Sequence, residues 1–159
     1  MNTKSMQPGQ YFALISGLFF FILGVIGCIP AFVTHVDATS AVSDAYGMGY
    51  GYIAGFIPTN GIHNFLRIMV GLFGIIASLA LDSSRTYSRV IAVFYGLFAV
   101  LGLIPYTKTL FGTVPIFGSD VLLHGISAAV ALYYGFIAMP GLIELGSGNP
   151  SVTPSQESR

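Results

Sequence analysis

The sequence predicts an all-α integral membrane protein, a four-helix bundle built from two parallel two-helix repeats. Only 8% of its 159 residues are charged and 54% are hydrophobic, whereas about a quarter of a typical soluble domain is charged. Spanning a hydrocarbon core takes roughly 20 apolar residues. Four segments meet this requirement, at about residues 11–33, 62–81, 88–105 and 119–139. We therefore expect one transmembrane domain and no separate soluble domain.

The predicted repeat rests on a motif that occurs twice. Residues 27–30 read Gly-Cys-Ile-Pro and residues 102–105 read Gly-Leu-Ile-Pro, each at the end of an apolar run. Each motif is followed by a second apolar run with a histidine near its start, His63 or His124. Because each copy holds two spans, the copies are parallel and related by an axis along the membrane normal. The repeat also indicates that Cys28 is an ordinary helical residue and not the lipidated cysteine of a lipoprotein signal.

The first helix is expected to end near Pro30, because proline removes a helical hydrogen bond. Residues 34–61 form a long connection without Lys or Arg. The apolar end of this connection, residues 53–57, is expected to lie at the membrane surface as a short interfacial segment. Asn60 is a favourable N-cap for the second helix.

A short basic link at residues 82–89 leads to the third helix, which is expected to end near Pro105. Ser119 or Asp120 is expected to cap the fourth helix, because both side chains can accept a hydrogen bond from the first turn. The Met-Pro-Gly sequence at residues 139–141 is expected to end that helix.

These boundaries give three parts: a cytoplasmic segment at 1–10, the transmembrane domain at 11–139 and a tail at 140–159. The tail is rich in Gly, Ser, Pro and Thr, which is typical of disorder.

Basic residues favour the cytoplasmic side of a membrane. On one side would lie Lys4, Arg85, Arg89 and Arg159, and on the other side Lys108. Both termini are therefore predicted to be cytoplasmic, in the bacterial inner membrane or in the thylakoid membrane of a photosynthetic host.

The second predicted helix carries one face of small and polar residues. Gly71, Gly74 and Ser78 recur at helical spacing with His63 and Arg67. Small residues along one stripe let helices approach closely in lipid, where burial of apolar surface gives no advantage. The stripe therefore indicates a tight bundle rather than a pore.

Arg67 lies one helical turn below His63, inside the predicted span. An arginine in mid-helix costs on the order of 2–3 kcal/mol on insertion scales, so such residues usually have partners. Asp120 at the outer end of the fourth helix is the expected partner, with Tyr106 and Asn64 as others. The alternative is that Arg67 snorkels to the outer headgroups.

His63 and His124 leave three interpretations open. They can be structural, they can ligate a haem or chlorophyll or part of a metal site, or they can handle protons beside Asp120. No cysteine or carboxylate cluster accompanies the two histidines in the sequence, so the indication of a metal site is weak. The structural interpretation is therefore favoured and no metal site is assigned. The candidate ligand-binding residues are His63, His124, Arg67, Asp120, Asn60 and Asn64.

Several motifs resemble an uncharacterised bacterial four-span membrane family, a domain of unknown function common in cyanobacteria and actinobacteria. The motifs are Asn-Gly-Ile-His-Asn at 60–64 with Gly71 and Gly74, and the segments 11–17, 102–105 and 114–120 with His124, which resemble the cyanobacterial branch. The resemblance implies a membrane protein and no established activity. The family often has a second histidine where this chain has Arg67, which counts against a metal site.

The sequence contains no hydrolytic or nucleotide-binding motif, which favours a non-enzymatic function, and its zero net charge gives no indication of nucleic-acid binding. The first hypothesis is an accessory or structural component of a bacterial bioenergetic membrane, in contact with lipid and a larger complex such as a photosystem. The alternative is a small-molecule transporter or a His-ligated redox protein, which would use the outer cluster of His63, Arg67, Asp120 and His124. The oligomeric state stays open.

Overall fold

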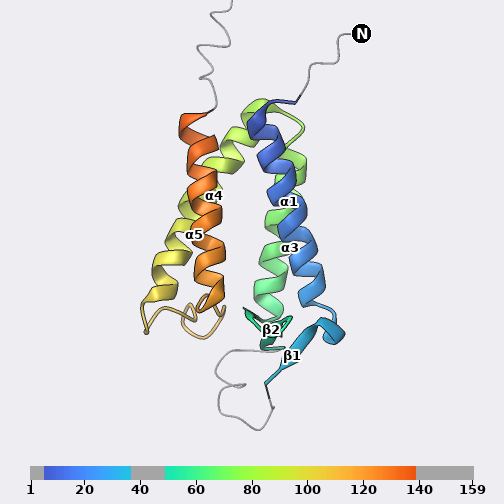
Figure 1. Cartoon of the computed structure of the whole chain (residues 1–159), viewed down its shortest axis with the longest axis vertical. Helices are drawn as coiled ribbons and strands as arrows, with labels where there is room; N and C mark the ends of the chain where they lie inside the picture. The colour runs from blue at the N-terminus through green and yellow to red at the C-terminus, as the bar shows by residue number, and fades with distance from the viewer. Residues whose placement is uncertain (1–5, 37–48, 139–159) are drawn as a thin grey trace, which may run out of the picture.

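The computed structural model describes residues 6–36 and 49–138, which form four helices and a small sheet at one end of the bundle (Figure 1). We call this end the sheet end. The helices are α1 (Pro8–Gly27), α3 (Gly61–Ala77), α4 (Leu81–Leu103) and α5 (Ser119–Leu132). A π-helical segment, Tyr133–Ile137, extends α5. The last predicted element, the helix end at 139–141, lies outside the described residues.

The sheet has three antiparallel strands in the order β1-β2-β3, preceded by a short 3₁₀ turn at Pro30–Phe32. The strands are β1 (Val33–His35), β2 (Gly51–Ile53) and β3 (Ile57–Thr59), with Val33 paired to Ile53 and Ile53 to Ile57. The expectation of an all-α fold is wrong in this respect. Three residues per strand are too few to show the alternation of apolar and polar residues by which a strand is recognised.

Two predicted helix boundaries are confirmed. The helix α1 ends at Gly27, and Cys28 follows as its C-cap just before Pro30. At the start of α3, the side chain of Asn60 accepts a hydrogen bond of 2.8 Å from the backbone N–H of His63.

The fourth helix has a different cap from the one predicted. Its N-cap is Gly118, which has a φ of 65°, a conformation that glycine adopts without strain. Ser119 and Asp120 lie in the first turn instead. The Ser119 hydroxyl donates to the carbonyl of Phe56 at 2.5 Å, and the Asp120 carboxylate faces Arg67, so neither side chain caps the helix.

The predicted basic link at 82–89 is helical, because α4 begins at Leu81. The hydroxyls of Ser84 and Ser88 each donate to a carbonyl of their own helix at 2.8 Å. Asp82 lies in the first turn, where a negative charge interacts favourably with the helix dipole. Polar residues at this position therefore continue the helix rather than end it.

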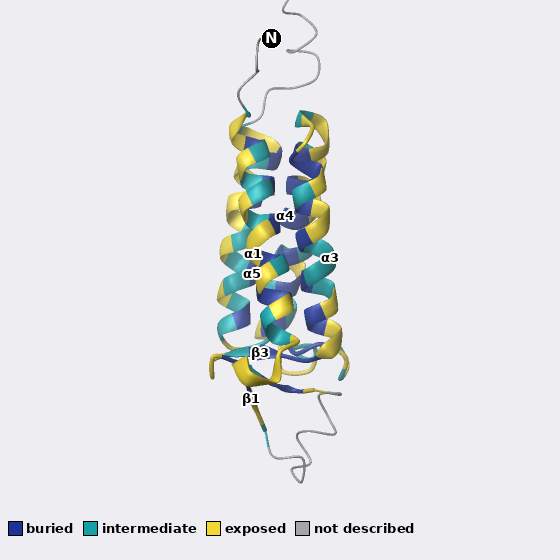
Figure 2. Ribbon diagram, turned by 90° about the vertical axis from the view of Figure 1, so that its right-hand side faces the viewer, coloured by how far each residue is buried: buried dark blue, intermediate teal, exposed yellow. Residues whose placement is uncertain are grey.

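Three helices are long and apolar enough to cross a membrane: Pro8–Gly27, Leu81–Leu103 and Ser119–Ile137. The helix α3 is apolar but shorter, with 17 residues, or about 26 Å at 1.5 Å per residue. Many large apolar residues of the helices are exposed, and the buried residues lie on the faces that the helices turn toward one another (Figure 2). The chain is therefore consistent with a small membrane protein.

The helices pack as two pairs, α1 with α3 and α4 with α5 (Figure 1). The stripe predicted on the second helix lies at the first of these contacts, where Gly17 of α1 meets the backbone of Gly71 and Gly74. A Cβ atom on Gly17 would lie 2.6 Å from the backbone nitrogen of Ile75, and one on Gly24 would lie 2.8 Å from the carbonyl oxygen of Asn64. Only glycine permits so close an approach of the two backbones.

Candidate functional site

The candidate site lies at the sheet end, where the first turns of α3 and α5 meet. His63 and Arg67 come from α3, and Asp120 and His124 come from α5. No residue of this four-residue cluster is more than 2% exposed. The structure thus brings together, away from solvent, the four residues that the sequence singled out.

Arg67 and Asp120 form the ion pair that the sequence predicts. The Nη2 atom of Arg67 donates to Oδ1 of Asp120 at 2.6 Å. The alternative in which Arg67 snorkels to the surface is wrong, because the residue is 1% exposed. Tyr106, another suggested partner, is 89% exposed and does not serve as one.

The strand β3 and the polar residues around it complete the binding of the guanidinium group. Arg67 donates from Nη1 to the hydroxyl of Thr59 at 3.1 Å, and from Nη2 to the carbonyl of Pro58 at 3.3 Å. The Thr59 hydroxyl donates to Oδ1 of Asn64 at 2.5 Å, and Asn64 donates to the carbonyl of Gly27 at 2.6 Å. Sequence reasoning missed Thr59 and Pro58, because the strand that carries them gives no local signal.

Asn60 ties the start of α3 to the connection between α4 and α5. Besides capping α3, it donates from Nδ2 to the carbonyl of Thr113 at 2.7 Å. Asn60 and Asn64 therefore belong to the hydrogen-bond network around the cluster, and all six candidate residues of the sequence lie in one region.

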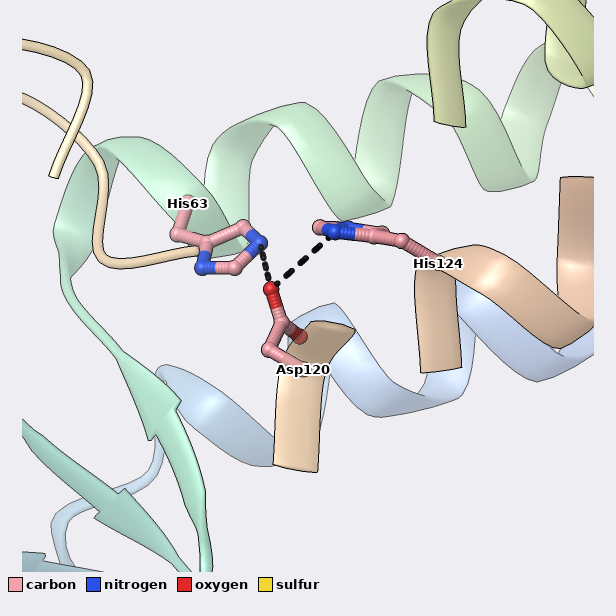
Figure 3. A group of neighbouring side chains, drawn as sticks. All are labelled: His63, Asp120 and His124. Carbon is pink, nitrogen blue, oxygen red and sulfur yellow. Dashed lines mark ion pairs between the residues drawn. The ribbon is translucent and has the colours of Figure 1, made fainter. Parts of the chain in front are cut away.

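The two histidines converge on the second oxygen of the same carboxylate (Figure 3). Nε2 of His63 and Nδ1 of His124 each lie 3.4 Å from Oδ2 of Asp120. These separations are longer than a good hydrogen bond, and both Asp120 Oδ2 and His124 Nδ1 are buried without a hydrogen-bond partner. Most buried polar atoms have such a partner, so these two require an explanation.

Aromatic rings enclose His124 on the side of α4. Its ring centroid lies 4.7 Å from that of Tyr95, 5.3 Å from that of Phe98 and 5.9 Å from that of His63. Asp120 Oδ2 is thus a shared neighbour of both imidazoles, and His124 lies against the aromatic rings of α4.

The family model for a domain of unknown function, DUF4383, matches residues 10–137, which is most of the chain. The chain belongs to this family. The match agrees with the resemblance to an uncharacterised family that the motifs indicate. No curated protein and no solved structure matches the chain. The function must therefore be inferred from the cluster and its surroundings.

A recess of about 710 Å³ lies at the sheet end, and none of its lining residues comes from α5. Its lining includes Gly27, Cys28, Val33, His35, Asn60 and Asn64. His35, the last residue of β1, is exposed. The recess contacts the hydrogen-bond network at the two asparagines, whereas the cluster itself stays buried.

Proposed function

We propose that this protein is a small accessory or structural component of a bacterial bioenergetic membrane. The observation that carries the proposal is the ion pair between Arg67 and Asp120, which joins α3 of one helix pair to α5 of the other. The charged groups of the cluster face one another and are at most 1% exposed. A buried, mutually bound arrangement of this kind supports a structural role more than the passage of a solute.

The lateral surface of the bundle, which faces lipid or a neighbouring protein, supports contact with other membrane components. An apolar recess of about 430 Å³ lies between α3 and α4, lined among others by Val70, Phe73, Ile76, Tyr87, Val90 and Phe94. Phe73 is 58% exposed and Val90 57% exposed. In a membrane, lipid tails or the helices of a larger complex cover such a surface, and in a photosynthetic host that complex is a photosystem.

In this proposal all four helices cross the bacterial inner membrane, or the thylakoid membrane, and both termini are cytoplasmic. The 17 residues of α3 are at the short end of the range for a spanning helix. The excess of basic residues on one side supports this orientation. The sheet and the cluster then lie at the outer surface.

Native purification of the tagged full-length chain from mild detergent tests the accessory role. We expect the chain to co-purify with one larger membrane complex, and the chain separated from that complex to be colourless. A variant with Phe73→Ala and Val90→Ala should lose that complex, because both side chains line the recess, whereas Phe19→Ala, on the exposed face of α1, should keep it. Recovery of the wild-type chain without any partner complex contradicts the proposal.

A second candidate function is transport or redox chemistry at the cluster, and the unpartnered Asp120 Oδ2 favours it. An anionic or quinone-like molecule would then lie against Arg67. Solute flux into liposomes that is lost in Arg67→Ala, or an absorption band that is lost in His63→Ala, would support this function over the accessory role. If the reconstituted protein shows neither solute flux nor an absorption band, the accessory role explains the structure better.

A further inference from the structure

We propose that His63, Asp120 and His124 form a binding site for one divalent first-row transition metal ion, with Zn²⁺ as the simplest occupant. The three side chains each offer one ligand atom, and these atoms lie within 4.8 Å of one another. In residues 6–36 and 49–138 this is the one group of at least three His, Cys, Asp or Glu side chains with that arrangement. The proposal does not depend on the accessory role.

The donor set identifies the class of metal. Two imidazole nitrogens and one carboxylate oxygen are the protein ligands of many zinc sites with an open fourth position, and of non-haem iron(II) sites. Mg²⁺ and Ca²⁺ prefer an all-oxygen shell. One carboxylate among two imidazoles therefore favours a transition metal over the hard cations.

The spacing of the ligand atoms agrees with this class. Zinc lies about 2.0–2.2 Å from nitrogen and oxygen ligands, which places the corners of a tetrahedral site roughly 3.4 Å apart. Both histidine nitrogens are 3.4 Å from Asp120 Oδ2. Since the ligand atoms are at most 4.8 Å apart, small rotations of the two imidazole rings bring the nitrogens to the required separation.

The buried polar atoms without hydrogen bonds give an independent reason to place a metal ion between the three side chains. Asp120 Oδ2 and His124 Nδ1 are buried without a hydrogen bond, and both point into the space between the three side chains (Figure 3). A buried polar atom without a partner destabilises the folded state, because it has lost its hydrogen bonds to water. One metal ion would bind both atoms and Nε2 of His63 together.

Arg67 acts as a positioning residue in this site. It holds Oδ1 of Asp120 at 2.6 Å and so leaves Oδ2 directed at the two histidines. Such outer partners of a ligating carboxylate typically affect metal affinity by about 10–100-fold. Because Arg67 already balances the charge of Asp120, we expect an anion such as hydroxide to take the fourth position.

Metal titration of the full-length protein tests the site. The protein carries a tag without histidine, is purified in detergent and is stripped with a chelator, and Co²⁺ serves as a coloured substitute for Zn²⁺. We expect one equivalent of Co²⁺ to produce the visible absorption of a four-coordinate site, and Zn²⁺ to displace it. His63→Gln and His124→Gln should each weaken binding by at least about tenfold, whereas His35→Gln, at an exposed histidine, should bind like the wild type.

The melting temperature with and without metal separates ligation from folding. Zn²⁺ should raise the melting temperature of the wild type and of His35→Gln, and Mg²⁺ should not. If the wild type binds no more Zn²⁺ than the double variant His63→Gln/His124→Gln, the proposal is overturned. That result leaves the accessory role intact, because the role is tested by the partner complex and not by metal.

Discussion

At the scale of single residues, Arg67 links three elements at the sheet end. Its guanidinium donates to Asp120, to Thr59 and to the carbonyl of Pro58, and thereby joins α3, α5 and the sheet. Neither residue of the ion pair is more than 1% exposed. Each charge therefore depends on the other, because removing one partner leaves the remaining charge buried without compensation.

We expect Arg67→Leu to lower the free energy of unfolding by roughly 3–5 kcal/mol, because it leaves Asp120 buried and unpaired. The double variant Arg67→Leu/Asp120→Leu should recover much of this loss, because no charge is then buried. Denaturant unfolding of the three proteins in detergent micelles measures both effects. A single variant Arg67→Leu that is more stable than the wild type would show that the ion pair does not join the helix pairs.

The sequence was sufficient to predict this ion pair but not its full environment. An arginine within an apolar span requires a partner, and Asp120 was the acidic residue at the correct end of another span. The contribution of Thr59 was not predictable, because it depends on the turn from β3 into α3. The convergence of two histidines on one carboxylate oxygen depends on side-chain geometry that spacing alone does not fix.

At the scale of elements, the contact between α1 and α3 is the closest in the bundle. Gly17 and Gly24 from α1 meet the backbone of α3 at distances that exclude a side chain. In the other pair, a Cβ atom on Gly96 of α4 would have as its nearest neighbour the Cβ of Ala128 at 3.9 Å, whereas one on Gly135 would lie 2.9 Å from the backbone nitrogen of Arg89. Gly17 and Gly96 therefore have different tolerance for added volume.

We expect Gly17→Ala to destabilise the protein by about 1–3 kcal/mol, because the new methyl group displaces the backbone of α3. Gly96→Ala is the matched control. It should be neutral or stabilising by up to about 1 kcal/mol, because alanine favours the helix and space is available. Unfolding of both variants under the same conditions gives the comparison, and equal effects would contradict the close approach of α1 and α3.

The start of α3 depends on a single side chain. We expect Asn60→Ala to cost about 0.5–2 kcal/mol through loss of the N-cap, together with the hydrogen bond to Thr113. Hydrogen exchange of the His63 amide, which Asn60 protects, should become faster. Asn60→Ser should retain most of the protection, because serine also accepts the capping bond. Unchanged exchange in Asn60→Ala would show that the cap does not hold this turn.

At the scale of the whole molecule, polar contacts are distributed unequally between the two ends. At the sheet end, Arg67 and Asp120 join the two helix pairs. At the other end, Gln10 donates to the carbonyl of Ser78 at 2.8 Å, within the first pair. The contact of Ser16 with Tyr87 does cross between the pairs, but at the longer distance of 3.4 Å. The ion pair between the helix pairs therefore lies at the sheet end, whereas at the other end residues 78–80 join α3 to α4 through the chain itself.

The single cysteine gives a direct test of membrane orientation. Cys28 is exposed and lies at the end of α1 nearest the sheet. We expect a membrane-impermeant maleimide to label it in intact right-side-out vesicles. Ser83→Cys in a Cys28→Ser background, at an exposed position in the first turn of α4, should be labelled only after permeabilisation. Labelling of both positions from the same side would contradict the proposed orientation.

The sequence by itself determined the long apolar helices that are consistent with a membrane protein, the cap at Asn60, the need of Arg67 for a partner and the small-residue stripe of α3. These properties follow from composition and from spacing within one helix. Only the tertiary structure decided the three-stranded sheet and the meeting of His63 and His124 at Oδ2 of Asp120. The reason is physical: His63 lies on α3 and Asp120 on α5, and side-chain contacts between residues so distant in the chain depend on how whole helices pack.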